Sequence, residues 1–189
     1  MKPFIIYISI ILLGLNFASG QMGMQTKTKA QSLEDQFSAP YLSKHQLEGF
    51  ESRVKQKVKD FIDYLNIVAN PEYDQELRKH AQDLALEFFT DPHQTFAGEG
   101  DLGKFLQTLL KSKEKISFSA EELTIEESLV DHFQRNAEFV PGELSFRFIQ
   151  EKKGKQEETD TILPFLLVQV EKKFGKDRLM VWEVRLGGN

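Results

Sequence analysis

The sequence predicts an α+β domain, in which helices come first along the chain and antiparallel strands follow. From residue 50 to residue 110, apolar side chains recur every three or four positions, as on the buried face of a helix. From residue 144 onward they recur mainly at every second position, as on one face of a strand. Helices followed by a run of strands are typical of α+β folds, in which a helical layer packs on one face of a sheet.

The first residues predict export from the cytoplasm. Lys2 precedes an almost unbroken apolar run over residues 4–17, and Ala18 and Gly20 follow at the positions that a signal peptidase reads. The run is shorter than the ~20 residues that span a bilayer. We therefore expect a signal peptide over residues 1–20 and no membrane span after its cleavage. An uncleaved membrane anchor is the alternative. We expect the periplasm as the destination rather than the extracellular medium.

The composition limits what the rest of the chain can do. The chain has 189 residues, a net charge of −5 and no cysteine, so it has neither disulfides nor cysteine-ligated metals. An acidic protein without a basic stripe is a poor candidate for binding nucleic acid. We expect residues 21–45, which are polar, to form a flexible tether. Residues 46–189 fit a single domain.

Three helices are predicted in the first half of the domain. The first covers residues 50–68 and ends at an Asn-Pro pair. The second starts after Asp74, a residue type that caps helices, and has Leu77 on its buried side and Arg78 on or beside its exposed side. Because the connection between them is short, these two helices should form an antiparallel hairpin. The third covers residues 102–110.

Three strands are predicted in the second half. Residues 144–148 and 180–186 alternate between apolar and polar, as strands with one buried face do. Residues 162–170 are apolar on both faces, which is typical of a central strand covered on both sides. Between the first two strands we expect residues 151–160 to form a long exposed loop. Residues 172–177 should form a hairpin turn.

Residues 119–136 fit two structures. Their apolar residues at odd positions favour a strand, but a Ser-Ala-Glu-Glu capping box at residues 119–122 and helical spacing further on also fit a helix. We favour a strand, or a strand with a bulge. The odd-numbered apolar residues are Leu123, Ile125, Leu129, Phe133 and Phe139.

This order of elements resembles the NTF2-like family, which has the cystatin-like cone fold, over residues 46–187. The resemblance implies a helical hairpin plus a third helix, packed on a curved antiparallel sheet of about four strands. It also implies a conical cavity between the sheet and the helices. The family has no short motif that could be matched here, so no catalytic residue is carried over.

Two acid–histidine neighbours, Asp91 with His93 and Asp131 with His132, are candidates for catalytic groups. Asp91 and His93 could pair as a base with its orienting carboxylate, but they flank Pro92 and have no nucleophile nearby in the sequence, so a connector is the better interpretation. Asp131 is a weak candidate for a general base. If residues 123–133 were one regular strand, it would lie on the apolar face, where burial would raise its pKa. A bulge or a helix would instead turn it to solvent.

We predict no cofactor and no metal site. The four histidines do not form a ligand pair of metal-binding spacing. Weak candidates for lining a ligand pocket are the apolar residues of the predicted sheet, although each fits an ordinary core equally well. They are Phe146, Phe148, Leu166 and Trp182.

The sequence thus favours an exported, non-enzymatic module that binds an envelope protein or a small apolar ligand. The open end of the cone and the loop at residues 151–161 are the expected binding surface. One alternative is a small isomerase, dehydratase or hydrolase with Asp131 in a cavity. Another is a structural or assembly subunit that forms a homodimer through its sheet.

Overall fold

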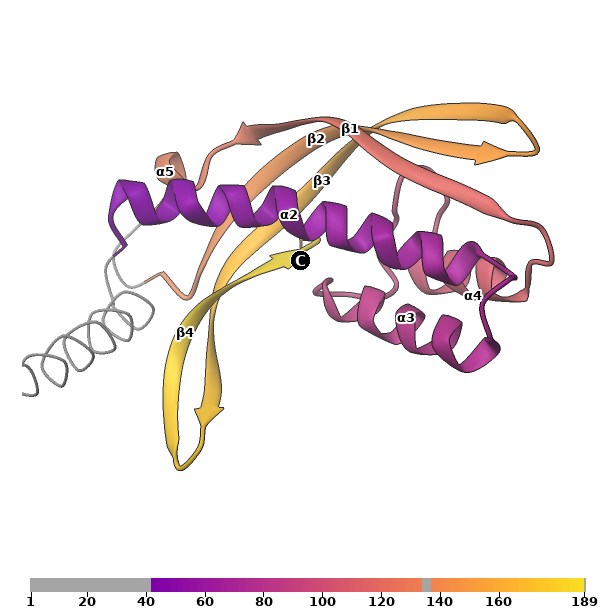
Figure 1. Cartoon of the computed structure of the whole chain (residues 1–189). Coiled ribbons are helices and arrows are strands. Elements are labelled where there is room, and N and C mark those ends of the chain that lie inside the picture. Colours follow the sequence, from indigo (N-terminus) through magenta and orange to yellow (C-terminus); the bar gives the residue numbers. More distant parts are fainter. Residues whose placement is uncertain (1–41, 134–136, 189) are drawn as a thin grey trace, which may run out of the picture. The chain divides into compact units, whose positions relative to one another are not determined.

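The computed structural model describes residues 42–133 and 137–188, which Figure 1 shows in colour. Within these residues, four helices and four strands confirm the predicted α+β class. The predicted signal peptide and most of the predicted tether lie outside the described residues. In chain order the elements are α2 (Lys44–Ala69), α3 (Gln75–Glu87), α4 (Leu102–Lys111), β1 (Ile116–Glu127), α5 (Leu129–His132), β2 (Phe139–Lys152), β3 (Lys155–Phe174) and β4 (Asp177–Leu186).

Helix α2 begins earlier than the sequence predicts. Ser43 and Gln46 form a capping box, in which each side chain accepts a hydrogen bond from the other residue's backbone N–H. Leu42, just before the cap, is buried. The end of the predicted tether is therefore the start of the domain. Each valine, leucine, isoleucine or phenylalanine side chain that α2 buries fully contributes about 1.5–3 kcal/mol. The buried residues of α2 are Leu47, Phe50, Val54, Val58, Phe61, Ile62, Leu65, Val68 and Ala69.

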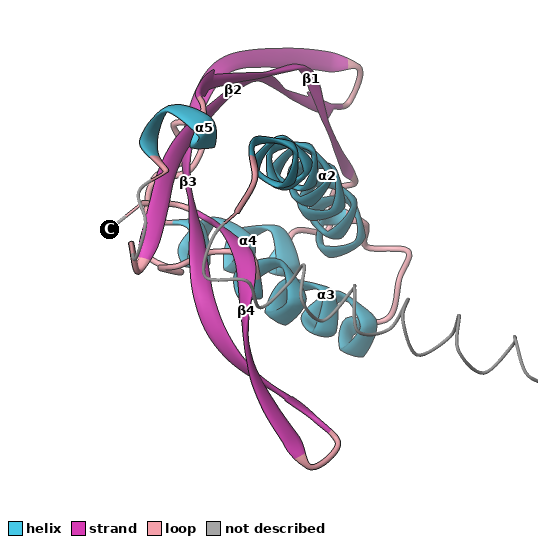
Figure 2. Cartoon of the chain, turned by 90° about the vertical axis from the view of Figure 1, so that its left-hand side faces the viewer, coloured by secondary structure: helices cyan, strands magenta, loops and turns pink. Residues whose placement is uncertain are grey.

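The four strands form one antiparallel sheet in the order β1-β2-β3-β4. The helical hairpin of α2 and α3 and the third long helix, α4, pack on it, as predicted. Figure 2 shows the sheet bending around α2, with α3 and α4 on the same side. We call the face toward these helices the inner face and the opposite face the outer face.

Phenylalanine rings fill the space between the helices and the inner face. Phe96, from the connection between α3 and α4, lies at their centre and is almost fully buried. Its ring centroid is 5.0 Å from that of Phe61 on α2 and 5.3 Å from that of Phe148 on β2. Such edge-to-face pairs contribute about 0.5–1.5 kcal/mol beyond the area they bury. These rings occupy the place where the resemblance to the cone fold implies a cavity.

The structure corrects the orientation predicted for α3. Leu77 is 42% exposed, whereas Arg78 is buried. The Arg78 guanidinium donates hydrogen bonds to the carbonyl oxygens of Val68 (2.8 Å) and Leu109 (2.9 Å), near the C-terminal ends of α2 and α4. Because these carbonyls lie where the helix dipole is negative, a buried cation is stable there.

The ambiguous segment is a strand first and a helix afterwards. Strand β1 runs to Glu127 with two irregularities in its pairing to β2, and α5 follows at once. Ser128 caps α5 by accepting a hydrogen bond from the Val130 N–H. The Glu51 carboxylate on α2 accepts hydrogen bonds from the Ser128 hydroxyl (2.6 Å) and the Leu129 N–H (2.9 Å). This contact from α2 fixes the point where the strand ends.

The predicted loop at residues 151–160 is wrong. Strands β2 and β3 continue to a two-residue turn at Lys153 and Gly154, with Lys152 paired to Lys155. Both turn residues have positive φ, 52° and 73°, as a type I′ hairpin turn requires. All residues from 151 to 160 are exposed, which explains the polar composition without a loop.

Candidate functional site

The outer face of the sheet is apolar along the middle of β3. In β3, Leu163, Phe165 and Leu167 point to the inner face and are buried in the core. Ile162 and Leu166 point to the outer face, where Ile162 is 66% exposed. The strand is therefore apolar on both faces, as the sequence indicates, but helices α2, α3 and α4 lie only on the inner side (Figure 2).

A strand that is apolar on both faces is normally covered on both. In the part of the chain that the structure describes, the outer face at Ile162 has solvent in place of a second layer. Exposed apolar surface on a sheet face is typical of interaction sites in proteins. The outer face is thus the strongest candidate for a binding surface.

Two grooves of about 320 and 330 Å³ lie on this face and share Phe139 and Leu166. Leu166 is almost fully buried, while Phe139, opposite Val168 on the neighbouring strand, is 47% exposed. The first groove is lined by Phe89, Thr90, Phe139, Leu166, Val168, Val170 and Arg185. The second is lined by Glu127, Phe139, Pro141, Gly142, Glu143, Pro164, Phe165, Leu166 and Gly188.

The β4 side of the grooves carries a positive charge. Arg185 donates a hydrogen bond to the Glu87 carbonyl oxygen (3.0 Å) and forms an ion pair with Glu183 (2.7 Å). Glu183 also forms an ion pair with Lys172 on β3. Burial alone would raise the pKa of the Glu183 carboxyl, but Lys172, Arg185 and Lys57 together lower it. Glu183 is therefore a carboxylate at neutral pH and keeps Lys172 and Arg185 in place.

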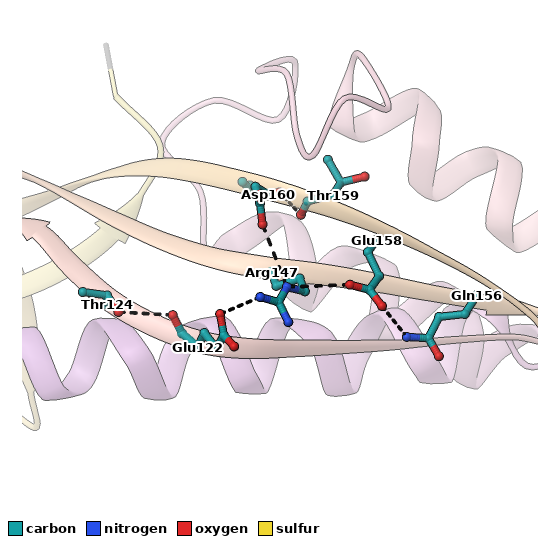
Figure 3. Close-up of polar contacts among 8 residues, drawn as sticks. Glu122, Thr124, Arg147, Gln156, Glu158, Thr159 and Asp160 are labelled. Carbon is teal, nitrogen blue, oxygen red and sulfur yellow. Dashed lines mark hydrogen bonds and ion pairs between the residues drawn. The ribbon is translucent and has the colours of Figure 1, made fainter.

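The opposite end of the outer face is acidic. Figure 3 shows Arg147 on β2 between Glu122 on β1 and two acids on β3, Glu158 and Asp160. The ion-pair distances are 2.7 Å to Glu122, 3.7 Å to Glu158 and 4.0 Å to Asp160. One cation does not neutralise three carboxylates, so this end has a negative surplus. Because the pairs are exposed, they contribute little to stability.

The four residues predicted to line a pocket do not line one pocket together. Phe146 and Phe148 lie in the core beside Phe96, at 6.5 and 5.3 Å between ring centroids. Trp182 is also in the core, with its ring 6.4 Å from that of Phe133. Leu166 alone lies on the outer face. One of the four residues predicted from the sequence, Leu166, is therefore a residue of the observed grooves.

Asp131 is exposed on α5. Asp131 does not lie on the apolar face of a regular strand, because β1 ends at Glu127. The ring Nε2 of the neighbouring His132 lies 2.7 Å from the Glu127 carboxylate.

The Asp91–His93 segment is a connection between α3 and α4. The Asp91 side chain accepts a hydrogen bond from the His93 backbone N–H, and the His93 ring contacts Asp101 at 3.0 Å. Asp101 caps α4 through the Lys104 N–H. That backbone hydrogen bond, with His93, lowers the pKa of Asp101. These contacts hold the chain in position, as the connector interpretation expects.

The groove residues Phe139, Val168, Val170 and Arg185 were missed from the sequence. The signal was present in the stretch at residues 162–170. Its even positions are apolar too, although a strand with one buried face needs apolar residues only at every second position. Only the structure shows which of the two faces the helices cover.

Across residues 42–133 and 137–188, no group of three or more histidine or acidic side chains could hold a metal ion. None of the helices in these residues is long and apolar enough to span a membrane. A scan against protein-family models, a search of the curated proteins and a search of the solved structures each returned no significant match to this chain.

Proposed function

We propose that this chain is an exported, non-enzymatic module of the periplasm that binds a protein partner through the outer face of its sheet. The observation that carries this proposal is the exposed apolar surface along β3 and at the start of β2, with Ile162 66% and Phe139 47% exposed. Burying such side chains in a complex is the main source of affinity in protein association. The export signal read at residues 1–20 supports the location.

A protein surface fits this face better than a small ligand. The grooves hold about 320 and 330 Å³, at the lower end of the roughly 300–1,000 Å³ of ligand pockets. They lie on a sheet face beside exposed side chains, so a small molecule would remain largely in water. The enzymatic alternative requires Asp131 in a cavity, and its exposure gives that alternative no support.

The relationship to the NTF2-like family is part of the proposal. It is supported by a helical hairpin, a third helix and a four-stranded antiparallel sheet in the expected order. An experimental structure that failed to superpose on members of that family would contradict it.

The test is capture of a partner from envelope extracts with the purified protein. The double variant Phe139→Ser/Ile162→Ser removes apolar surface at exposed positions and should abolish capture of a stoichiometric partner. Leu77→Ser is the matched control, because Leu77 is similarly exposed on α3, away from the sheet. A partner retained by the double variant, or turnover of a substrate by the protein, would contradict the proposal.

A second candidate is a structural subunit that dimerises through the same face. The outer face is acidic near Glu158 and Asp160 and carries Lys172 and Arg185 at its other end, with apolar residues between. A two-fold axis through the middle of β3 would place the acidic end of one copy against the basic end of the other. Sedimentation equilibrium at micromolar concentration tests this, and a monomer throughout would exclude a stable dimer.

A further inference from the structure

Strand β4 lies at one edge of the sheet, and its even-numbered residues point their backbone groups outward. The Leu186 N–H donates to the Phe88 carbonyl oxygen, and the Leu186 carbonyl accepts from the Thr90 N–H, both at 2.8 Å. The Val184 carbonyl accepts a hydrogen bond from the Lys57 ammonium at 2.6 Å. Since the outward direction alternates along an antiparallel strand, Arg178 and Met180 point outward as well.

These contacts cover only the last part of the β4 edge. Among residues 42–133 and 137–188, no hydrogen bond reaches the outward backbone groups of Arg178 and Met180. On the other edge of the sheet, the backbone of one residue is covered by a side chain. On β1, the Asn66 side chain accepts from the Phe118 N–H (2.8 Å) and donates to the Phe118 carbonyl oxygen (2.9 Å), as a neighbouring strand would. An unprotected strand edge is a template for pairing with another chain.

This part of β4 lies on a two-stranded arm. Strand β2 begins at Phe139, which pairs with Val168, so beyond this point β4 is the only strand among the described residues that pairs with β3. Figures 1 and 2 show the β3–β4 hairpin extending past the rest of the sheet. A two-stranded ribbon alone is at best marginally stable in water. A third strand would complete the ribbon.

The end of the arm carries more positive than negative charge. Between residues 171 and 178 there are four cationic and two acidic side chains, in a chain whose net charge is −5. Lys173 and Arg178 lie directly opposite each other, and like charges in this position repel. Arg178 forms an ion pair with Glu171 at 3.3 Å. On the outer side, Val181 lies opposite Val170.

We propose that the β4 edge at residues 178–180 takes up an extended, acidic segment of a partner polypeptide as an added strand. The backbone of the segment pairs with Arg178 and Met180. Its acidic side chains lie beside Arg178, next to which Lys173 adds positive charge on β3, and its apolar side chains lie on the outer side beside Leu179. This is strand addition, in which the main chain gives affinity and alternate side chains give specificity. The edge is separate from the outer-face grooves, so the proposal stands independently of the proposed function.

The probe is a blocked synthetic peptide of about eight residues, the length of an ordinary strand, that alternates valine with glutamate. The control peptide alternates valine with lysine. Isothermal titration calorimetry should show the glutamate peptide binding at least about tenfold more tightly, roughly 1.4 kcal/mol. Amide hydrogen exchange by NMR should show new protection at Met180 and Arg178. Absence of glutamate-peptide binding at millimolar concentration overturns the proposal, as does protection confined to the outer-face grooves.

Two substitutions at Met180 distinguish backbone pairing at the strand edge from contacts made by the Met180 side chain. Met180→Pro removes an outward N–H without removing a hydrogen bond to β3, a position where edge strands tolerate proline. It should weaken glutamate-peptide binding at least about tenfold, whereas Met180→Val should leave it unchanged. Equal binding by wild type and Met180→Pro overturns the proposal.

Charge reversal provides a test that does not depend on the proline variant. The double variant Lys173→Glu/Arg178→Glu should bind the lysine peptide more tightly than the glutamate peptide. An unchanged preference for the glutamate peptide would contradict the proposal that the partner segment is acidic. Phe139→Ser/Ile162→Ser should retain peptide binding, which distinguishes this edge from the proposed partner face. Self-association that Met180→Pro abolishes would instead assign the edge to a second copy of the chain.

Discussion

Replacing the buried Arg78 with methionine should destabilise the domain by about 2–4 kcal/mol. Its guanidinium makes two hydrogen bonds, to Val68 and Leu109, and hydrogen bonds to charged groups contribute about 1.5–3 kcal/mol each. The variant leaves two helix-end carbonyls without their donor. Relief of the cost of burying a cation, and the packing of the methionine chain, offset part of the loss.

Urea unfolding monitored by circular dichroism measures this difference in the free energy of unfolding. If that free energy depends on urea concentration with the same slope in both proteins, their folded and unfolded states are comparable. Arg78→Lys keeps the charge but not the two-pronged geometry, so it should lie between wild type and Arg78→Met. Lys79→Met, at the exposed next position, should change the free energy of unfolding by less than about 0.5 kcal/mol. The reasoning fails if Arg78→Met is as stable as Lys79→Met.

Further predictions concern close packing and pH. Gly142→Ala should cost about 1–3 kcal/mol, because a Cβ would overlap the ring of Phe165, whereas Gly49→Ala in α2 meets no atom within 4 Å and should stabilise by about 0.5–1 kcal/mol. Urea unfolding should show a lower free energy of unfolding for Gly142→Ala and a higher one for Gly49→Ala than for the wild type. Lysine ammonium groups, that of Lys153 foremost, lower the pKa of Glu114 from 4.5 to about 2. The pKa of Glu114 is lower in the folded than in the unfolded state. Its ion pairs therefore stabilise the fold fully above pH 4.5, and this stabilisation is lost as the pH falls toward 2. An NMR titration of the Glu114 carboxyl should give a higher pKa in Lys153→Met, and an unchanged pKa would contradict the assignment.

The helices were predictable because their apolar spacing and their caps agree. Asp74 caps α3 as expected, accepting a hydrogen bond from the Leu77 N–H at 2.8 Å. Arg78 was misplaced because sequence periodicity treats arginine as a surface residue. Its burial depends on carbonyls at the ends of α2 and α4, which are separated from it by 10 and 31 positions in the sequence.

The sheet was predictable in its class and only partly in its details. The charged residues at 151–160 suggested a loop, yet strands exposed on both faces have the same composition. The end of β1 is set by Glu51 on α2, a contact across 77 positions that no local pattern indicates. The outer-face grooves could not be located for a related reason, since the choice of covered face is made by helix packing.

The hydrogen bonds between α2 or α3 and β4 have a consequence for how the molecule assembles. Lys57 reaches Val184 across 127 positions, and Arg185 reaches the carbonyl of Glu87 across 98. Contacts between residues so far apart in the sequence form slowly, because the entropy of closing a long loop is lost before the contacts stabilise the fold. A growing polypeptide therefore cannot complete its core until the last strand, β4, has been synthesised.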